Sequence, residues 1–168
     1  MSERKSVGVP PVGVFWQDEE FADWWIREAT IFPFFDGQKL KLVLHGFVPA
    51  EDKNFPAEAG AVLSQFLKKG NADRLAISEP VHKNCREFLE AVGYEKEDDA
   101  MREIEYPDEI WRFVQPQVVY VKRNRYDNRD IYISVECNCD WEREHGLQLV
   151  FRRGETLTRV SQVDGHLT

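Results

Sequence analysis

Residues 131–151 read IYISVECNCDWEREHGLQLVF, and the alternation of side chains along them sets the interpretation of the chain. Apolar and polar residues alternate with a period of two up to Asn138, and the alternation returns from Leu147 to Phe151. This period is typical of strands with one buried face and one wetter face. Two such runs joined by a polar loop predict an antiparallel pair of strands.

Two further strands flank this pair. Residues 117–122 are apolar and β-branched, a composition that favours a strand, and a polar turn follows them at residues 123–129. On the other side, Arg153-Gly154 is a turn signal that leads into residues 156–161. Four successive strands with short connections predict an antiparallel meander at the end of the chain.

The middle of the chain has helical periodicity. Pro56 fits the first turn of a helix and Gly70 fits its end. A second helix is predicted from Ser78, a good N-cap residue, to Gly93, and a third over residues 107–114. The buried stripe of the first helix is expected to comprise Ala59, Val62, Leu63, Phe66 and Leu67.

An N-terminal hairpin is predicted over residues 24–47, with its turn at Asp36-Gly37. Residues 1–11 are expected to be a flexible tail, and residues 12–168 a single domain. Two strands, about three helices and then four strands predict an α+β fold, with the helices packed on a mostly antiparallel sheet. One face of the first hairpin strand is expected to carry Trp24, Ile26, Thr30, Phe32 and Phe34.

Composition narrows the class of partner. The formal net charge is −8, and a field of this sign repels phosphate backbones and anionic membranes. Nucleic acid and membranes are therefore not expected as partners, whereas a protein with a basic surface is favoured. Three cysteines without disulfide-framework spacing favour a reducing cytoplasm. No pattern indicates an oligomeric state.

Most of the side chains that carry chemistry lie between Glu136 and Gly146. This stretch holds two thiols, an imidazole and several carboxylates, and a second imidazole follows in Asp164-Gly165-His166. Zn²⁺ binds four converging sulfur and nitrogen ligands, although one residue between the two cysteines is a shorter spacing than usual. One hypothesis is therefore a zinc site with the ligands Cys137, Cys139, His145 and His166.

Oxygen ligands in the same stretch make Ca²⁺ a second metal hypothesis, although the spacing differs from that of the helix–loop–helix calcium motif. Its ligands would be Glu136, Asp140, Glu142 and Glu144. No other cofactor is expected, since the sequence contains no glycine-rich phosphate loop and no dinucleotide fingerprint.

Two interpretations of this stretch need no metal. In a small hydrolase, His145 would activate the Cys139 thiol as a nucleophile, although no cysteine-hydrolase signature surrounds either residue. In a structural corner, Trp141 would fill the core, Gly146 would let the backbone turn, and the carboxylates would accept hydrogen bonds from loop amides.

The chain also resembles a known family. Residues 135–151 and the terminal Asp-Gly-His-Leu at residues 164–167 resemble the C-terminal half of an uncharacterised bacterial domain family with a Cys-Asp-Trp-Glu-x-Glu-His-Gly-Leu block. The segments at residues 34–37 and 107–111 are similar to that family too. The resemblance implies no activity and no catalytic residues. It marks as the candidate functional cluster Glu136, Cys139, Asp140, Trp141, Glu142, Glu144, His145, Asp164 and His166.

The sequence therefore favours a non-enzymatic protein-interaction module. By analogy with other small acidic bacterial domains, the resemblance implies a toxin-neutralising, immunity-type protein. The alternatives are a metal-binding protein or a small hydrolase, with the site formed by residues 136–145 and the end of the chain.

Overall fold

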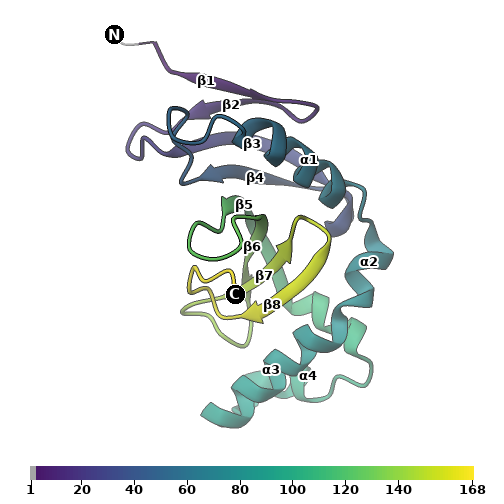
Figure 1. Ribbon diagram of the computed structural model, residues 1–168. Coiled ribbons are helices and arrows are strands. Elements are labelled where there is room, and N and C mark those ends of the chain that lie inside the picture. Colours follow the sequence, from purple (N-terminus) through teal and green to yellow (C-terminus); the bar gives the residue numbers. More distant parts are fainter. Residues whose placement is uncertain (1–2) are drawn as a thin grey trace.

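The alternating pattern of residues 131–151 forms two antiparallel strands, β6 (Ile131–Cys139) and β7 (Leu147–Arg152), in the computed structural model, which describes residues 3–168. β5 (Val114–Arg123) pairs with β6, and β8 (Thr156–Ser161) pairs with β7, both antiparallel. Together with the N-terminal strands they build one eight-stranded sheet in chain order (Figure 1). The predicted α+β class with a mostly antiparallel sheet is confirmed.

The N-terminal part of the sheet has two more strands than the predicted hairpin. β1 (Ser6–Val9) and β2 (Gly13–Gln17) precede β3 (Trp24–Phe32) and β4 (Gln38–His45). Much of the expected tail is therefore part of the sheet, because β1 pairs with β2 and Val9 is completely buried in the core. The first two residues of that expected tail lie outside the described residues.

A register shift in β3 corrects the predicted hairpin face. The pairing with β4 is irregular between Arg27 and Thr30, so the alternation of side chains changes phase within the strand. Phe32 lies in the main core, whereas Trp24 and Ile26 lie on the opposite face of the sheet. The expectation that Trp24, Ile26, Thr30, Phe32 and Phe34 share one face was wrong, and Phe34 belongs to the short helix η1 (Pro33–Phe35).

More helical elements join β4 to β5 than the three predicted. The first two predictions correspond to α1 (Phe55–Leu67) and α3 (Ser78–Val92), and the third is the 3₁₀ helix η3 (Pro107–Phe113). Three short elements were not predicted, since each is too brief to show a periodic stripe. These are α2 (Asn71–Ala76), η2 (Lys96–Asp98) and α4 (Asp99–Arg102).

β4 and β5, which this helical connection joins, run parallel to each other. They are the one parallel pair in the sheet of residues 3–168. A parallel pair needs a crossover connection, which the helices supply. The register places His45 beside Lys122 and Val43 beside Tyr120. Residues that are about 77 positions apart in the chain thus share one surface.

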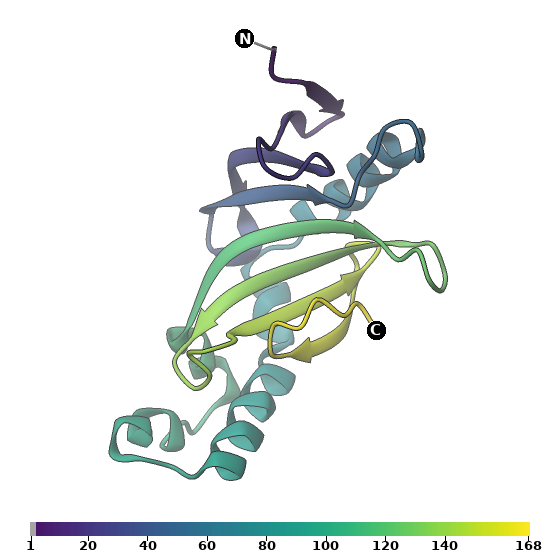
Figure 2. The ribbon, with the colours of Figure 1, turned by 90° about the vertical axis from the view of Figure 1, so that its left-hand side faces the viewer.

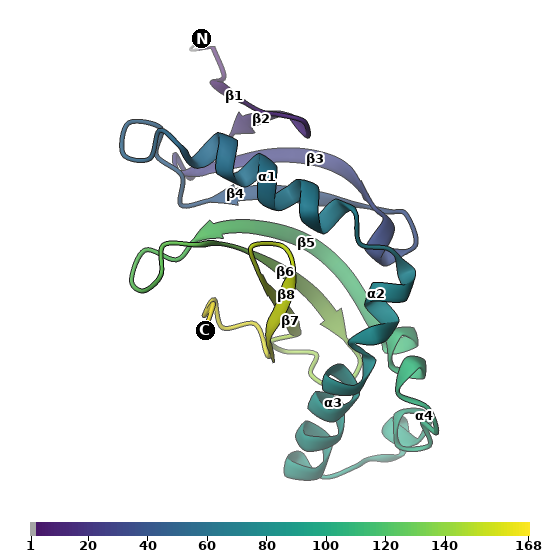
Figure 3. The ribbon, with the colours of Figure 1, turned by 45° about the vertical axis from the view of Figure 1, so that its right-hand side comes forward.

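The two faces of the sheet differ. One face packs on α1 through apolar residues such as Leu42, Val119 and Phe151, and it forms the main core. Figure 3 shows α1 lying along β3 and β4. No helix of residues 3–168 covers the other face, termed the open face; only residues 162–168, termed the C-terminal segment, cross it (Figure 2). Among the described residues, no helix is long and apolar enough to cross a membrane.

Candidate functional site

Glu142 organises the connection between β6 and β7, at residues 139–146, termed the corner. Its Oε1 accepts hydrogen bonds from the backbone N–H groups of Glu144 (3.1 Å) and His145 (3.2 Å), and its Oε2 lies 3.2 Å from His145 Nδ1. Burial opposes ionisation of Glu142, but the hydrogen bonds from His145 and Glu144 outweigh it and hold its pKa below the usual value. Both carboxylate oxygens of Glu142 thus have partners within the loop and stabilise its conformation.

Two other residues fix the corner against the core. Trp141 is buried and donates its indole N–H to Asn84 Oδ1 in α3 at 3.0 Å. Gly146 has a φ of +72°, and a Cβ at this position would overlap the carbonyl oxygen of Cys137. These contacts are those of a structural corner, one of the interpretations that the sequence leaves open.

The cysteines face the main core. Cys85, Cys137 and Cys139 are all free and buried, and Cys139 is only 2% exposed. Burial raises the pKa of Cys85 to about 12 and that of Cys139 to about 11, and it raises the pKa of Cys137 as well. Thiols with such pKa values are protonated at neutral pH and are poor nucleophiles.

The proposed metal ligands do not converge. His145 is exposed and its Nδ1 faces Glu142, while the two β6 thiols point into the core. Across residues 3–168 no three side chains of His, Cys, Asp or Glu are grouped so that they could hold a metal ion. Glu144 is exposed, and Asp140 is near Gln115 Nε2 at 3.4 Å.

The terminal Asp-Gly-His sequence ties the C-terminal segment to the sheet. Asp164 Oδ1 accepts hydrogen bonds from the backbone N–H of His166 (2.9 Å) and from Nε2 of the fully buried Gln148 (3.1 Å). Gln148 Nε2 also donates to the carbonyl oxygen of His166 at 2.7 Å, and Asp164 pairs with Arg159. The His166 ring itself is exposed. This motif, like the corner, therefore shapes the surface around it.

Glu136, in contrast, lies on the open face in a row of half-buried titratable groups. β5 and β6 place Tyr120 between Glu136 and Lys122, and the Lys122 Nζ is 5.1 Å from the Tyr120 ring centre. Burial raises the pKa of Glu136 and lowers that of Lys122, and each charge partly offsets the effect on the other. Burial also raises the pKa of Tyr120. Partly buried, perturbed groups that face outward are typical of binding and catalytic sites.

A hollow of about 580 Å³ opens at the Lys122 end of this row. His45 and Lys122 form part of its floor, the connection between β5 and β6 forms one side, and the C-terminal segment forms another. The His45 ring packs against Trp24 at a tilt of 49° (5.0 Å between centres), and burial lowers the pKa of His45, with a further contribution from Lys122. The volume of the hollow lies within the range of small-molecule binding sites.

An exposed aromatic patch, Trp16, Phe21 and Trp24, adjoins the hollow. Trp16 is 43% exposed and Phe21 is 50% exposed. Trp16 lies opposite Ile26, which makes it a diagonal neighbour of Trp24 on the open face. The Phe21 ring lies 4.8 Å from that of Trp24. Phe21 itself belongs to the acidic loop, residues 18–23, which also contains Asp18, Glu19, Glu20 and Asp23.

This surface was not predicted from the sequence. His45 was predicted to lie in the N-terminal hairpin and Lys122 to be the last residue of a strand, and no role was assigned to Trp16 or Phe21. The available signal was the clustering of aromatic residues beside carboxylates in residues 15–25, FWQDEEFADWW. Within the predicted cluster, Glu142 contacts His145, and Asp164 accepts a hydrogen bond from the backbone N–H of His166. Glu136 and Cys139, in contrast, point to opposite faces of the sheet.

Comparison with protein-family models finds a match, over residues 14–167, to the family described as "Domain of unknown function (DUF6985)". No curated protein and no solved structure matches the chain.

Proposed function

The chain belongs to the DUF6985 family, and from its surface we propose that it is a non-enzymatic protein-interaction module that binds a basic partner. The binding surface in this proposal is the aromatic patch together with the acidic loop. The proposal is carried by the exposure of Trp16 and Phe21 on the open face, where the Phe21 ring packs against Trp24 and Trp16 is a diagonal neighbour of Trp24.

Exposed aromatic residues of this kind support a protein interface. Tryptophan and other aromatic residues are enriched at the centres of interfaces, where burying one contributes much of the binding free energy. Trp16 and Phe21 are half exposed, so the folded chain alone does not gain the full free energy of burying their rings. A partner that covers the two rings would gain this free energy on binding.

The charges around the patch support a basic partner. The acidic loop carries four carboxylates in six residues, and the backbone N–H groups of Glu20 and Phe21 donate to Asp18 Oδ1, both at 2.9 Å. These hydrogen bonds lower the pKa of Asp18 and keep it ionised, and the cations near it are Lys41 and Arg4. Arginine and lysine side chains bind favourably both to carboxylates and to aromatic faces.

The alternatives receive less support from the geometry. A hydrolase would need an accessible thiol near a base, but Cys139 is buried and its thiol donates to the carbonyl oxygen of Glu142 at 3.6 Å. A metal site would need converging donors, and the exposed His145 and His166 lie apart from the buried thiols. Neutralising a basic toxin by direct binding is one form of the proposed function.

The test is affinity capture from cells of the source organism with three matched baits. The first is the unaltered protein, and the second carries Trp16→Ser and Phe21→Ser. The third carries Ile31→Ser and Tyr106→Ser, which remove two exposed side chains outside the patch. The proposal predicts a protein of high pI that is retained by the first and third baits and lost from the second. Equal retention by all three baits would refute it.

A second comparison tests the charge. Glu19→Lys with Glu20→Lys reverses two charges of the acidic loop, and Glu95→Lys with Glu97→Lys makes the same change in the exposed segment before α4. We expect only the first pair to weaken binding of the captured partner, and by a margin that shrinks as salt is added.

A further inference from the structure

We infer that the hollow at the end of the open face is a separate binding site for a small aromatic monocarboxylate, with Lys122 as its charge partner. The inference does not depend on the proposed protein partner. It rests on the unpaired charge of Lys122, on the balance of charges around the hollow, and on the nature of its walls.

Lys122 is a half-buried cation without a close counter-ion. Within residues 3–168 its Nζ forms no hydrogen bond and no ion pair, and it lies over the Tyr120 ring. Among the residues that the structure describes, Glu136 is the one carboxylate that acts on Lys122 appreciably, and the two charges lie beyond ion-pair distance. Removing an ammonium group from water without a partner is unfavourable, so a bound anion at this position would be stabilising.

The other charges around the hollow favour a single negative charge. Arg123 also lines it, but that guanidinium pairs with Asp52 at 2.5 Å and with Glu58. Arg125 donates to the Gly46 carbonyl oxygen and keeps donors free for a ligand. Asp23 and Asp127 also line the hollow and equal Lys122 and Arg125 in number, but neither acts appreciably on Lys122. One uncompensated ammonium group suits a single negative charge, and the two nearby carboxylates disfavour a phosphate with two charges.

The walls suit a flat, partly apolar body. His45 and Leu167 line the hollow, together with the fully exposed Tyr126, and the His45 ring is backed by Trp24 and Tyr120 at 5.0 and 5.9 Å between centres. Aromatic rings at these separations pack favourably against one another and against a ligand ring. Leu167 is held in place through the Gln148 hydrogen bonds to Asp164 and His166.

The test is a titration of the full chain, followed by NMR of the backbone amides, with benzoate, benzamide and inorganic phosphate as probes. Benzamide has the shape of benzoate without its charge. We expect benzoate to shift the amides around His45, Lys122 and Leu167 and to bind at least about tenfold more tightly than benzamide, as a charge-assisted hydrogen bond requires. Phosphate should bind more weakly than benzoate.

Two variants tie the binding to this site. Lys122→Met should weaken benzoate binding by about tenfold or more, and Arg125→Gln, in an exposed loop, should weaken it by a smaller factor. Lys39→Met, at an exposed position on β4, is the control and should not change it. Equal binding of benzoate and benzamide, unchanged binding in folded Lys122→Met, or amide shifts confined to another part of the molecule would overturn the inference.

Discussion

The Nζ of Lys122 lies 5.1 Å from the centre of the Tyr120 ring, on the face of the sheet that no helix of residues 3–168 covers. This position costs the protein stability, because the ammonium group is half buried and lacks a close carboxylate. Lys122→Met should therefore raise the free energy of unfolding at pH 7 by the order of 1 kcal/mol. The measurement is urea unfolding, with Lys39→Met as the control.

The pH dependence of that gain has a defined sign. Burial lowers the pKa of Lys122 in the folded state below its ordinary value of 10.5. The cost of the buried charge is therefore complete below the folded-state pKa, and it disappears above pH 10.5, where the lysine is neutral in both states. A gain from Lys122→Met that grew between pH 9 and 11 would contradict this account.

Gly146→Ala should be among the most destabilising single substitutions in the corner. Its φ of +72° disfavours any Cβ, and that Cβ would also overlap the Cys137 carbonyl oxygen. Gly165→Ala is a matched control, because Gly165 has a similar φ of +76° but open space around it. We expect about 1–2 kcal/mol for Gly165→Ala from strain alone and clearly more for Gly146→Ala. Equal losses in thermal or urea unfolding would show that the overlap does not matter.

Much of the fold was predictable because it is local. The alternation of residues 131–151 predicted β6 and β7, and helical spacing predicted α1 and α3. β1 was missed because a four-residue strand contains too few residues to show a period. The register shift in β3 was missed because pairing with β4, and not the sequence of β3 alone, sets the phase of its side chains.

The candidate site was harder to predict because pairing between distant segments creates it. The parallel register of β4 and β5 brings His45 beside Lys122, and no local pattern predicts that register. Within the stretch that stood out in the sequence, residues 136–146, the corner at residues 139–146 uses its polar groups in hydrogen bonds to its own backbone and to Asn84. A tight loop rich in polar residues can use them to satisfy its own backbone hydrogen bonds as readily as to bind or transform a ligand.

Glu142→Gln should weaken the corner. Glu142 is ionised and accepts hydrogen bonds from two backbone N–H groups, so we expect a loss of about 1–2 kcal/mol at pH 7. The exposed Glu144→Gln is the control, with a change within about 0.5 kcal/mol. Because the folded-state pKa of Glu142 is lowered, its contribution is present above about pH 4.5 and is lost as the pH falls through the folded-state pKa. The difference between Glu142→Gln and the unaltered protein should therefore narrow in acid.

The thiols should be unreactive in the native protein. A thiol-specific disulfide reagent at pH 8 should modify none of Cys85, Cys137 and Cys139 until urea unfolds the chain, after which all three should react. Rapid native-state modification of Cys139 would contradict the burial described here and revive the hydrolase hypothesis.

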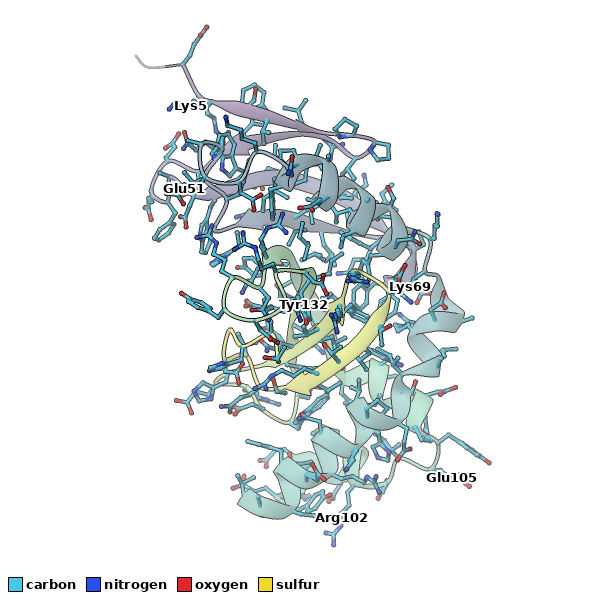
Figure 4. The ribbon with its side chains drawn as sticks, viewed as in Figure 1. Lys5, Glu51, Lys69, Arg102, Glu105 and Tyr132 are labelled. Atoms are coloured by element: carbon cyan, nitrogen blue, oxygen red, sulfur yellow. The ribbon has the colours of Figure 1, made fainter. Side chains whose placement is uncertain are left out.

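The most direct test of the proposed function is amide hydrogen exchange of the protein alone and in complex with its captured partner. The account predicts new protection over residues 14–26, which contain the aromatic patch and the acidic loop. Figure 4 shows Arg102 and Glu105 at the end of the molecule opposite Lys5, whose carbonyl oxygen accepts a hydrogen bond from the N–H of Gln17. Protection confined to residues 95–106, with none over residues 14–26, would contradict the claim that the open-face patch binds the partner.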